Sequence, residues 1–100
     1  MKLMHSRDIE TSILGSILID PQYCMPKCLE AIAPMDFYEE THNTIYTIML
    51  KLFSENKPID CISVLHTNKE LSASYVSGLS DSASYTVKNI AGYCKELKEM

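Results

Sequence analysis

The chain has 100 residues, of which 46% are hydrophobic, and a formal net charge of −4 from nine Lys and Arg against thirteen Asp and Glu. This length and mixed composition predict one small globular domain over residues 1–100 and exclude a disordered chain. The basic residues are scattered and Arg7 is the single arginine, so the basic stripe that binds phosphates is missing and nucleic acid is not expected as a direct ligand.

The N-terminal sequence does not have the pattern of a targeting segment. Arg7, Asp8 and Glu10 interrupt its apolar residues, which excludes a signal peptide or a membrane span. Without a secretory signal, the four cysteines are expected to be reduced thiols. We therefore expect a cytoplasmic protein that makes no membrane contact.

The first expected helix runs from about Arg7 to Leu18, with its apolar residues on one face and Ser6 as N-cap. Asp8 and Glu10 suit the positive end of its macrodipole. Gly15 falls inside this helix, where it costs about 1 kcal/mol relative to alanine. Such a glycine either permits close approach of another helix or is tolerated on the surface, and we expect tight packing at Gly15.

A short second helix is expected to begin at Asp20-Pro21, an acidic cap followed by proline at the first helical position. Pro26 should kink or restart this helix, and Ala33-Pro34 should close it. Met25 and Met35 lie beside these proline breaks. Because methionine adapts to many surfaces, these two residues are the candidate partner contacts.

The third helix is expected from about Thr41 to Ser54. His42 lies in its first turn, where the helix N-terminus disfavours an imidazolium, so a neutral ring that packs or bonds locally is expected rather than a proton-transfer group. Pro58 should stop the chain from continuing as a helix, and Asp60 should cap a short helix. The inward side chains of the third helix are Ile45, Ile48, Met49, Leu52 and Phe53.

Two more helical segments complete the chain. One carries Leu71, Tyr75, Val76 and Leu79. The last begins near Thr86 and turns five side chains inward, namely Val87, Ile90, Ala91, Cys94 and Leu97. The pattern predicts an all-α fold, a compact single-domain bundle of five to six helices.

No catalytic, cofactor-binding or metal-binding residue is expected in this chain. Cys24 and Cys28 lie one helical turn apart and could share a metal with Cys61, Cys94 or a histidine, but there is no Cys-x-x-Cys pair and the spacing is not that of a zinc module. We therefore expect the cysteines to be buried thiols rather than metal ligands. No glycine begins a phosphate-binding loop, so no ATP site is expected and the chain is not predicted to be an enzyme.

Several short sequence motifs follow one another along the chain. They are Ile9-Glu10, the run from Ile13 to Asp20, Asp36-Phe37-Tyr38, His42, Ile45-Tyr46, Pro58-Ile59-Asp60, Tyr75-Val76 with Leu79, and Asn89-Ile90 with Tyr93. In this order and spacing, from about Asp8 to Glu96, they resemble the N-terminal domain of the DnaB-type bacterial replicative DNA helicase. The residues of these motifs are expected to be helix caps, chain breaks and core anchors. They are Leu14, Gly15, Phe37, Tyr38, His42, Ile45, Tyr46, Pro58, Asp60, Asn89 and Tyr93.

The resemblance implies an all-helical head that precedes a RecA-like ATPase domain by way of a helical hairpin and a linker. Six heads form a collar on the helicase ring, commonly as a trimer of dimers, and the collar region receives primase and, in some systems, a loader. Residues 1–100 would be such a head, lacking most of the dimerising hairpin and the whole ATPase domain with its ATP and Mg. We expect a protein-interaction domain for ring assembly and recruitment.

The chain departs from the family pattern at two places. Only three residues, 72–74, separate Leu71 from Tyr75 where the family has a longer segment with paired glycines, and Tyr85 stands where a proline often precedes the final helix. Three alternatives stay open. They are a helix-turn-helix DNA-binding regulator, which should gather polar and basic residues on one exposed helix, a small metal-dependent enzyme, and a stand-alone adaptor related to the helicase-binding domain of primase.

Overall fold

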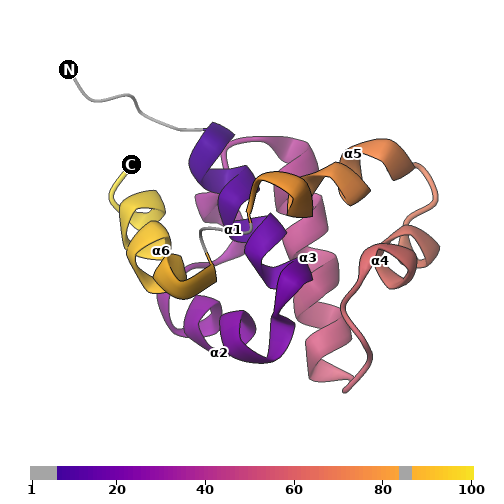
Figure 1. The fold of residues 1–100 in the computed structure, drawn as a ribbon, viewed down its shortest axis with the longest axis horizontal. Coiled ribbons are helices and arrows are strands. Elements are labelled where there is room, and N and C mark those ends of the chain that lie inside the picture. The colour runs from indigo at the N-terminus through magenta and orange to yellow at the C-terminus, as the bar shows by residue number, and fades with distance from the viewer. Residues whose placement is uncertain (1–6, 84–86) are drawn as a thin grey trace.

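The first helix lies at the centre of the fold, and four other α-helices pack directly against it (Figure 1). The computed structural model describes residues 7–83 and 87–100, and these residues contain no strand. The α-helices are α1 (Arg7–Ile19), α2 (Pro21–Ala31), α3 (Glu40–Ser54), α4 (Cys61–Thr67), α5 (Ala73–Leu79) and α6 (Ile90–Lys98). Three short 3-10 helices join them, η1 (Pro34–Asp36), η2 (Ser80–Ser82) and η3 (Val87–Asn89). The predicted all-α fold is confirmed.

Residues 13–17 of α1 are buried on every side. Ile13, Leu14 and Ile17 have no exposed surface, and Gly15 and Ser16 between them are buried as well. A helix that is apolar all round belongs inside a domain, which explains why α1 is central. In Figure 1, α2 and α6 lie on one side of it, and α4 and α5 on the other.

Gly15 allows the chain after α5 to cross α1 at very short range. A Cβ at position 15 would lie 2.1 Å from the carbonyl oxygen of Leu79 and 2.6 Å from the Cβ of Ala83. The predicted close packing at Gly15 is therefore confirmed. Gly92 of the last helix, by contrast, is exposed, and no atom outside its own helix backbone and chain neighbours lies within 4 Å of such a Cβ.

Helix α2 begins as predicted but passes through its internal proline. The backbone N–H of Tyr23 donates to the Asp20 carboxylate at 3.2 Å, with Pro21 at the first helical position. Of the two outcomes predicted at Pro26, a kink or a restart, the restart is wrong, because a single helix continues to Ala31. Pro26 is exposed, so water can bond to the carbonyl of the preceding turn that the missing N–H leaves free.

Helix α3 ends by a local motif that precedes Pro58. Asn56 adopts a left-handed conformation with φ 58°. Its N–H donates to the Phe53 carbonyl at 3.1 Å, and the N–H of Lys57 donates to the Leu52 carbonyl at 2.9 Å. This pair of bonds is a Schellman motif, which satisfies the last free carbonyls of the helix. Asp60 then caps α4 as predicted, because its carboxylate accepts from the N–H of Ser63 at 2.8 Å.

The C-terminal part of the chain agrees with the predicted pattern except at one position. Ile90, Cys94 and Leu97 of α6 are buried, but Ala91 is exposed, so its predicted inward position is wrong. The buried residues follow the spacing i, i+4, i+7, which leaves position 91 beside the apolar stripe. The N-cap predicted at Ser6 and the helix start predicted near Thr86 lie outside the described residues.

Candidate functional site

A buried carboxylate lies at the centre of the most elaborate polar cluster of the described residues. Glu10 of α1 has no exposed surface. Its two oxygens accept hydrogen bonds from the backbone N–H of Tyr38 at 2.7 Å, the N–H of Glu39 at 3.3 Å and Nδ1 of His42 at 2.7 Å. Glu10 thus binds both the segment that leads into α3 and the first turn of α3.

His42 continues this cluster toward α5. Its Nε2 lies 2.5 Å from the hydroxyl oxygen of Tyr75, and the two rings stack with their centroids 5.9 Å apart. When Nδ1 donates to the Glu10 carboxylate, Nε2 of the neutral ring accepts the Tyr75 hydroxyl proton. This arrangement gives each nitrogen of the fully buried ring a partner.

Arg7 closes the cluster at the surface. One guanidinium nitrogen donates to the Tyr75 hydroxyl oxygen at 3.3 Å, and another lies 3.0 Å from the Glu39 carboxylate. The proximity of Tyr75, followed by the bond to Glu39, raises the pKa of the Arg7 guanidinium. Burial raises the pKa of the Tyr75 phenol. We call these five residues, Glu10, His42, Tyr75, Arg7 and Glu39, the α1–α3–α5 polar cluster.

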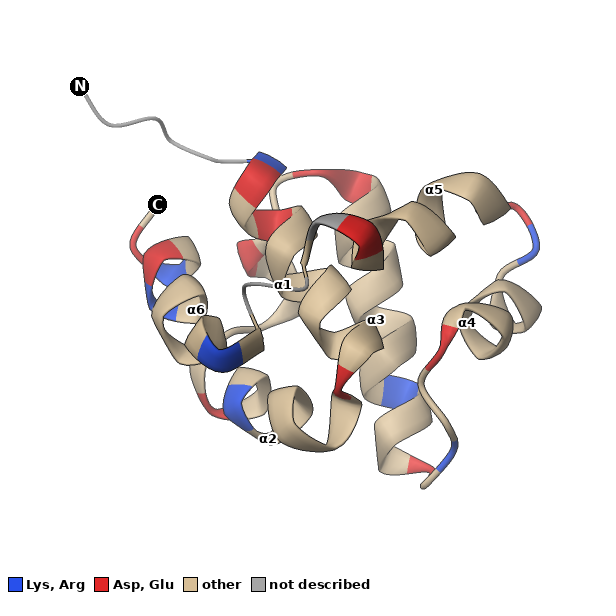
Figure 2. Ribbon diagram, in the orientation of Figure 1, with Lys and Arg blue, Asp and Glu red and all other residues tan. Residues whose placement is uncertain are grey.

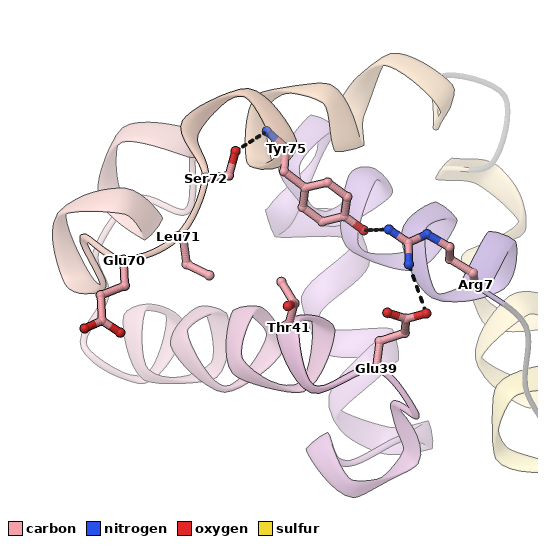
Figure 3. A pocket seen from close by; sticks show the side chains of 7 residues that line it. All are labelled: Arg7, Glu39, Thr41, Glu70, Leu71, Ser72 and Tyr75. Carbon is pink, nitrogen blue, oxygen red and sulfur yellow. Dashed lines mark hydrogen bonds and ion pairs between the residues drawn. The ribbon is translucent and has the colours of Figure 1, made fainter.

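A pocket of about 410 Å³ lies next to the polar cluster (Figure 3). Tyr75 and Arg7 point toward each other at one end of it, and Glu70 lies at the other end. Its lining residues are Arg7, Glu39, Thr41, Glu70, Leu71, Ser72 and Tyr75. Glu10 and His42 are not among these residues, so the carboxylate–imidazole pair does not face the pocket. The Tyr75 hydroxyl is already bonded on both sides, and the arrangement joins three helices rather than presenting a reactive group.

The cysteines lie mainly in the core. Cys24, Cys28 and Cys94 have no exposed surface, which confirms the prediction of buried thiols, and Cys61 is half-buried. Burial raises the pKa of the Cys24 thiol to about 11. Within residues 7–83 and 87–100, no group of three or more His, Cys, Asp and Glu side chains is placed to hold a metal ion.

The predicted anchors occupy several kinds of position. Leu14, Gly15, Phe37, His42, Ile45 and Tyr46 are buried, and Asp60 is a cap. Tyr38 contributes its backbone N–H to Glu10, while its side chain is 69% exposed. Pro58 and Asn89 are exposed and Tyr93 is half-buried, and Asn89 makes no side-chain cap bond to α6.

Two sequence predictions about this region are wrong. Met25 was expected as a partner contact, but it has no exposed surface, because α2 turns it with Cys24 and Cys28 toward the core. Met35, the other candidate, is 81% exposed. His42 was expected to bond locally, but its partners Glu10 and Tyr75 lie 32 and 33 residues away in the sequence.

Sequence reasoning missed the role of Glu10, although the pattern contains a signal for it. Glu10 was placed at the solvated start of its helix because of the macrodipole. It precedes Ile13, Leu14 and Ile17 by three, four and seven residues, which is the spacing of a single helical face. An acidic residue on the buried stripe of a central helix indicates a buried partner.

Most of the exposed large apolar side chains come from α2 and from the residues next to it in the sequence. Of the six large hydrophobic residues that are exposed in the described parts of the chain, four come from residues 19–35. We call these four, Ile19, Tyr23, Leu29 and Met35, the α2 apolar set. Lys27 of α2 places its ammonium 4.9 Å from the centre of the Tyr23 ring. Nothing in the fold of the described residues requires these four apolar side chains at the surface.

The chain matches a family described as DnaB-like helicase N terminal domain over residues 2–99. Replicative DNA helicase DnaB of Geobacillus stearothermophilus is 30% identical over 101 residues, which cover 94% of this chain and 22% of that protein. Replicative DNA helicase DnaB of Rhodothermus marinus is 33% identical over 57 residues, 57% of this chain and 6% of that protein. The chain thus spans less than a quarter of the length of these relatives.

The fold gives the same result as the sequence comparison. The crystal structure of the N-terminal domain of DnaB helicase from Mycobacterium tuberculosis superimposes with a TM-score of 0.86 and 26% sequence identity, over 95% of this chain and 71% of that chain. The resemblance of the sequence motifs to the N-terminal domain of DnaB-type helicases is therefore confirmed. With a match over nearly its whole length and a shared fold, this chain belongs to the DnaB-like helicase N terminal domain family.

Proposed function

We propose that this chain is a protein-interaction head of a replicative DNA helicase, which takes part in assembly of the helicase ring and in recruitment of primase or of a helicase loader. ATP hydrolysis and strand separation would belong to an ATPase domain outside these 100 residues. The protein would work in the cytoplasm. Within the described residues, no helix is long and apolar enough to cross a membrane.

The observation that carries this proposal is the distribution of polar and apolar groups. The buried Glu10 and His42 are both used inside the fold, whereas the α2 apolar set is exposed. Aromatic residues and methionine are enriched at protein–protein interfaces. Tyr23 and Met35 are therefore suitable contacts for another protein. The family relation supports a partner from the helicase assembly, and we propose another helicase subunit, primase or a loader.

Nucleic acid is not proposed as a direct ligand. Figure 2 shows that the Lys and Arg residues of the described chain are distributed over several helices and loops, with acidic residues between them. A phosphate-binding surface requires several basic residues side by side. Measurement of binding to duplex DNA at low salt tests this point, and tight, salt-sensitive binding would contradict it.

Mutation of the α2 apolar set provides the main test. We expect Leu29→Ser and Met35→Ser to weaken binding to the primase encoded in the same genome by at least about tenfold each, since hot-spot residues contribute about 1–2 kcal/mol or more. Ile62→Ser is a matched control, because Ile62 is 69% exposed on α4, on the other side of the fold. Equal binding by all three variants would contradict the use of this surface.

Self-association tests the assembly part of the proposal. If the dimerising hairpin lies mainly outside these 100 residues, the chain should be a monomer or a weak dimer in analytical ultracentrifugation. A tight hexamer would show that the head alone carries the pairing surface, contrary to the proposal.

A further inference from the structure

Two buried cysteines from distant parts of the chain are in contact between α2 and α6. Cys28 and Cys94 both have no exposed surface, and their Sγ atoms lie 3.6 Å apart. Cys24, one turn before Cys28, instead donates to the carbonyl oxygen of Ser16 at 3.4 Å. The helices that carry Cys28 and Cys94 pack directly against each other (Figure 1). The fold thus selects one pair out of the four cysteines.

We propose that Cys28 and Cys94 are a redox pair, which an oxidant of the hydroperoxide class converts into a disulfide that links α2 to α6. A disulfide has an S–S length of about 2.05 Å, so the two sulfur atoms must approach by about 1.5 Å. Rotation of the two short side chains, together with a small shift of α6, supplies this approach. The inference concerns the fold itself and does not depend on the proposed function.

The chemistry balances with hydrogen peroxide as the only co-reactant. One thiolate attacks a peroxide oxygen, which gives a sulfenic acid and releases hydroxide, and the proton of that thiol converts the hydroxide into water. The second sulfur then attacks the sulfenic sulfur, so that the S–S bond forms, the S–O bond breaks and a second water leaves with the remaining thiol proton. Both sulfurs are oxidised and both peroxide oxygens are reduced.

The hydrogen bond between the two thiols couples their ionisation. When Cys94 ionises, the S–H of Cys28 donates to its thiolate, which lowers the pKa of Cys94. The same bond, with burial, raises the pKa of Cys28. The two thiols ionise as a coupled pair, so either sulfur can react first and the other completes the disulfide, because the thiolate is the nucleophile.

Oxidation requires a transient opening of α6, since both sulfurs are buried. This helix has nine residues, and its local opening needs less free energy than global unfolding. The disulfide would close a loop between residues separated by 66 positions and hold α6 against α2. Oxidised protein should therefore show slower amide exchange in α6 than reduced protein.

The test is peptide mapping of the 100-residue chain after treatment with hydrogen peroxide and alkylation of the remaining thiols. We expect a Cys28–Cys94 peptide as the main cross-link, reversed by dithiothreitol, with at least a tenfold slowing of amide exchange in α6. Cys61→Ala is the matched control and should form the same cross-link, whereas Cys94→Ala should form none.

Three results would overturn the proposal. They are a main cross-link that involves Cys24 or Cys61, the absence of any cross-link while Cys61 is oxidised, and unchanged or faster exchange in α6 of the cross-linked protein. Should Cys94→Ala fail to fold, the wild-type peptide map and the exchange measurement still decide the question, because neither depends on that variant.

Discussion

Replacement of Glu10 by alanine would remove the acceptor that three donors share. The N–H groups of Tyr38 and Glu39 and Nδ1 of His42 all bond to its carboxylate. Alanine leaves a fully buried imidazole without its partner and two backbone donors without an acceptor. The start of α3 would then lose its direct polar connection to α1.

The expected magnitude follows from burial. Each buried donor that loses its acceptor costs about 1–3 kcal/mol when it cannot reach water, and more when the lost bond was made to a charged group such as a carboxylate. Because Tyr38 and Glu39 are near the surface, we expect water to reach their N–H groups and the total to be about 4 kcal/mol. Glu10→Gln keeps one oxygen and should cost less, about 1–3 kcal/mol.

Urea unfolding followed by far-UV circular dichroism measures these changes. Asp8→Ala is the matched control, since Asp8 is an exposed acidic residue in the same first turn and should cost at most about 1 kcal/mol. A double-mutant cycle with His42→Ala should give a coupling free energy of at least about 1 kcal/mol. If Glu10→Ala and Asp8→Ala cost the same, the carboxylate does not hold the three helices together.

Three further predictions concern packing, capping and pH. Gly15→Ala should lower the free energy of unfolding by about 2 kcal/mol, because the new methyl group meets backbone atoms. Gly92→Ala should instead raise it by up to about 1 kcal/mol. Equal effects of the two substitutions in urea unfolding would contradict the close packing at Gly15. Asp60→Ala should cost about 1 kcal/mol through loss of the α4 cap, measured in the same way, and no change would exclude the cap. Burial raises the pKa of the Cys24 thiol from 9.0 to about 11 and also raises the pKa of the Tyr46 phenol. The unfolded chain therefore loses these protons first, and stability should fall by roughly 1 kcal/mol per pH unit between pH 9 and 11 in a pH series of melting curves, less so in Cys24→Ala.

Helix positions could be predicted because they depend on near neighbours in the sequence. The predicted range from Arg7 to Leu18 differs by one residue from the observed α1, and the caps at Asp20 and Asp60 were both correct. Each of these features is set by periodicity or by a side chain three residues from its partner. The end of α3 at Ser54 was also predicted correctly, although the residue that ends the helix is Asn56 in a left-handed conformation rather than Pro58.

The contacts between helices could not be predicted from the same information. The bonds that join Glu10, His42 and Tyr75 depend on how α1, α3 and α5 pack, and no local pattern in one sequence determines that packing. The prediction that Met25 is a partner contact was wrong for a similar reason. Its neighbour Pro26 suggested an irregular, exposed segment, but the uninterrupted helix turned Met25 into the core.

The polar cluster bears on the proposed function through rigidity. A buried carboxylate–imidazole pair contributes little net stability compared with an apolar core, but it favours the one packing in which every partner is satisfied. Here that packing fixes α1 relative to α3 and α5. Because α2 follows α1 after a single residue, the orientation of the exposed α2 apolar set is fixed with it. A surface that is already rigid loses less entropy when a partner binds, so disruption of Glu10 should weaken partner binding even though Glu10 is fully buried and makes no contact itself.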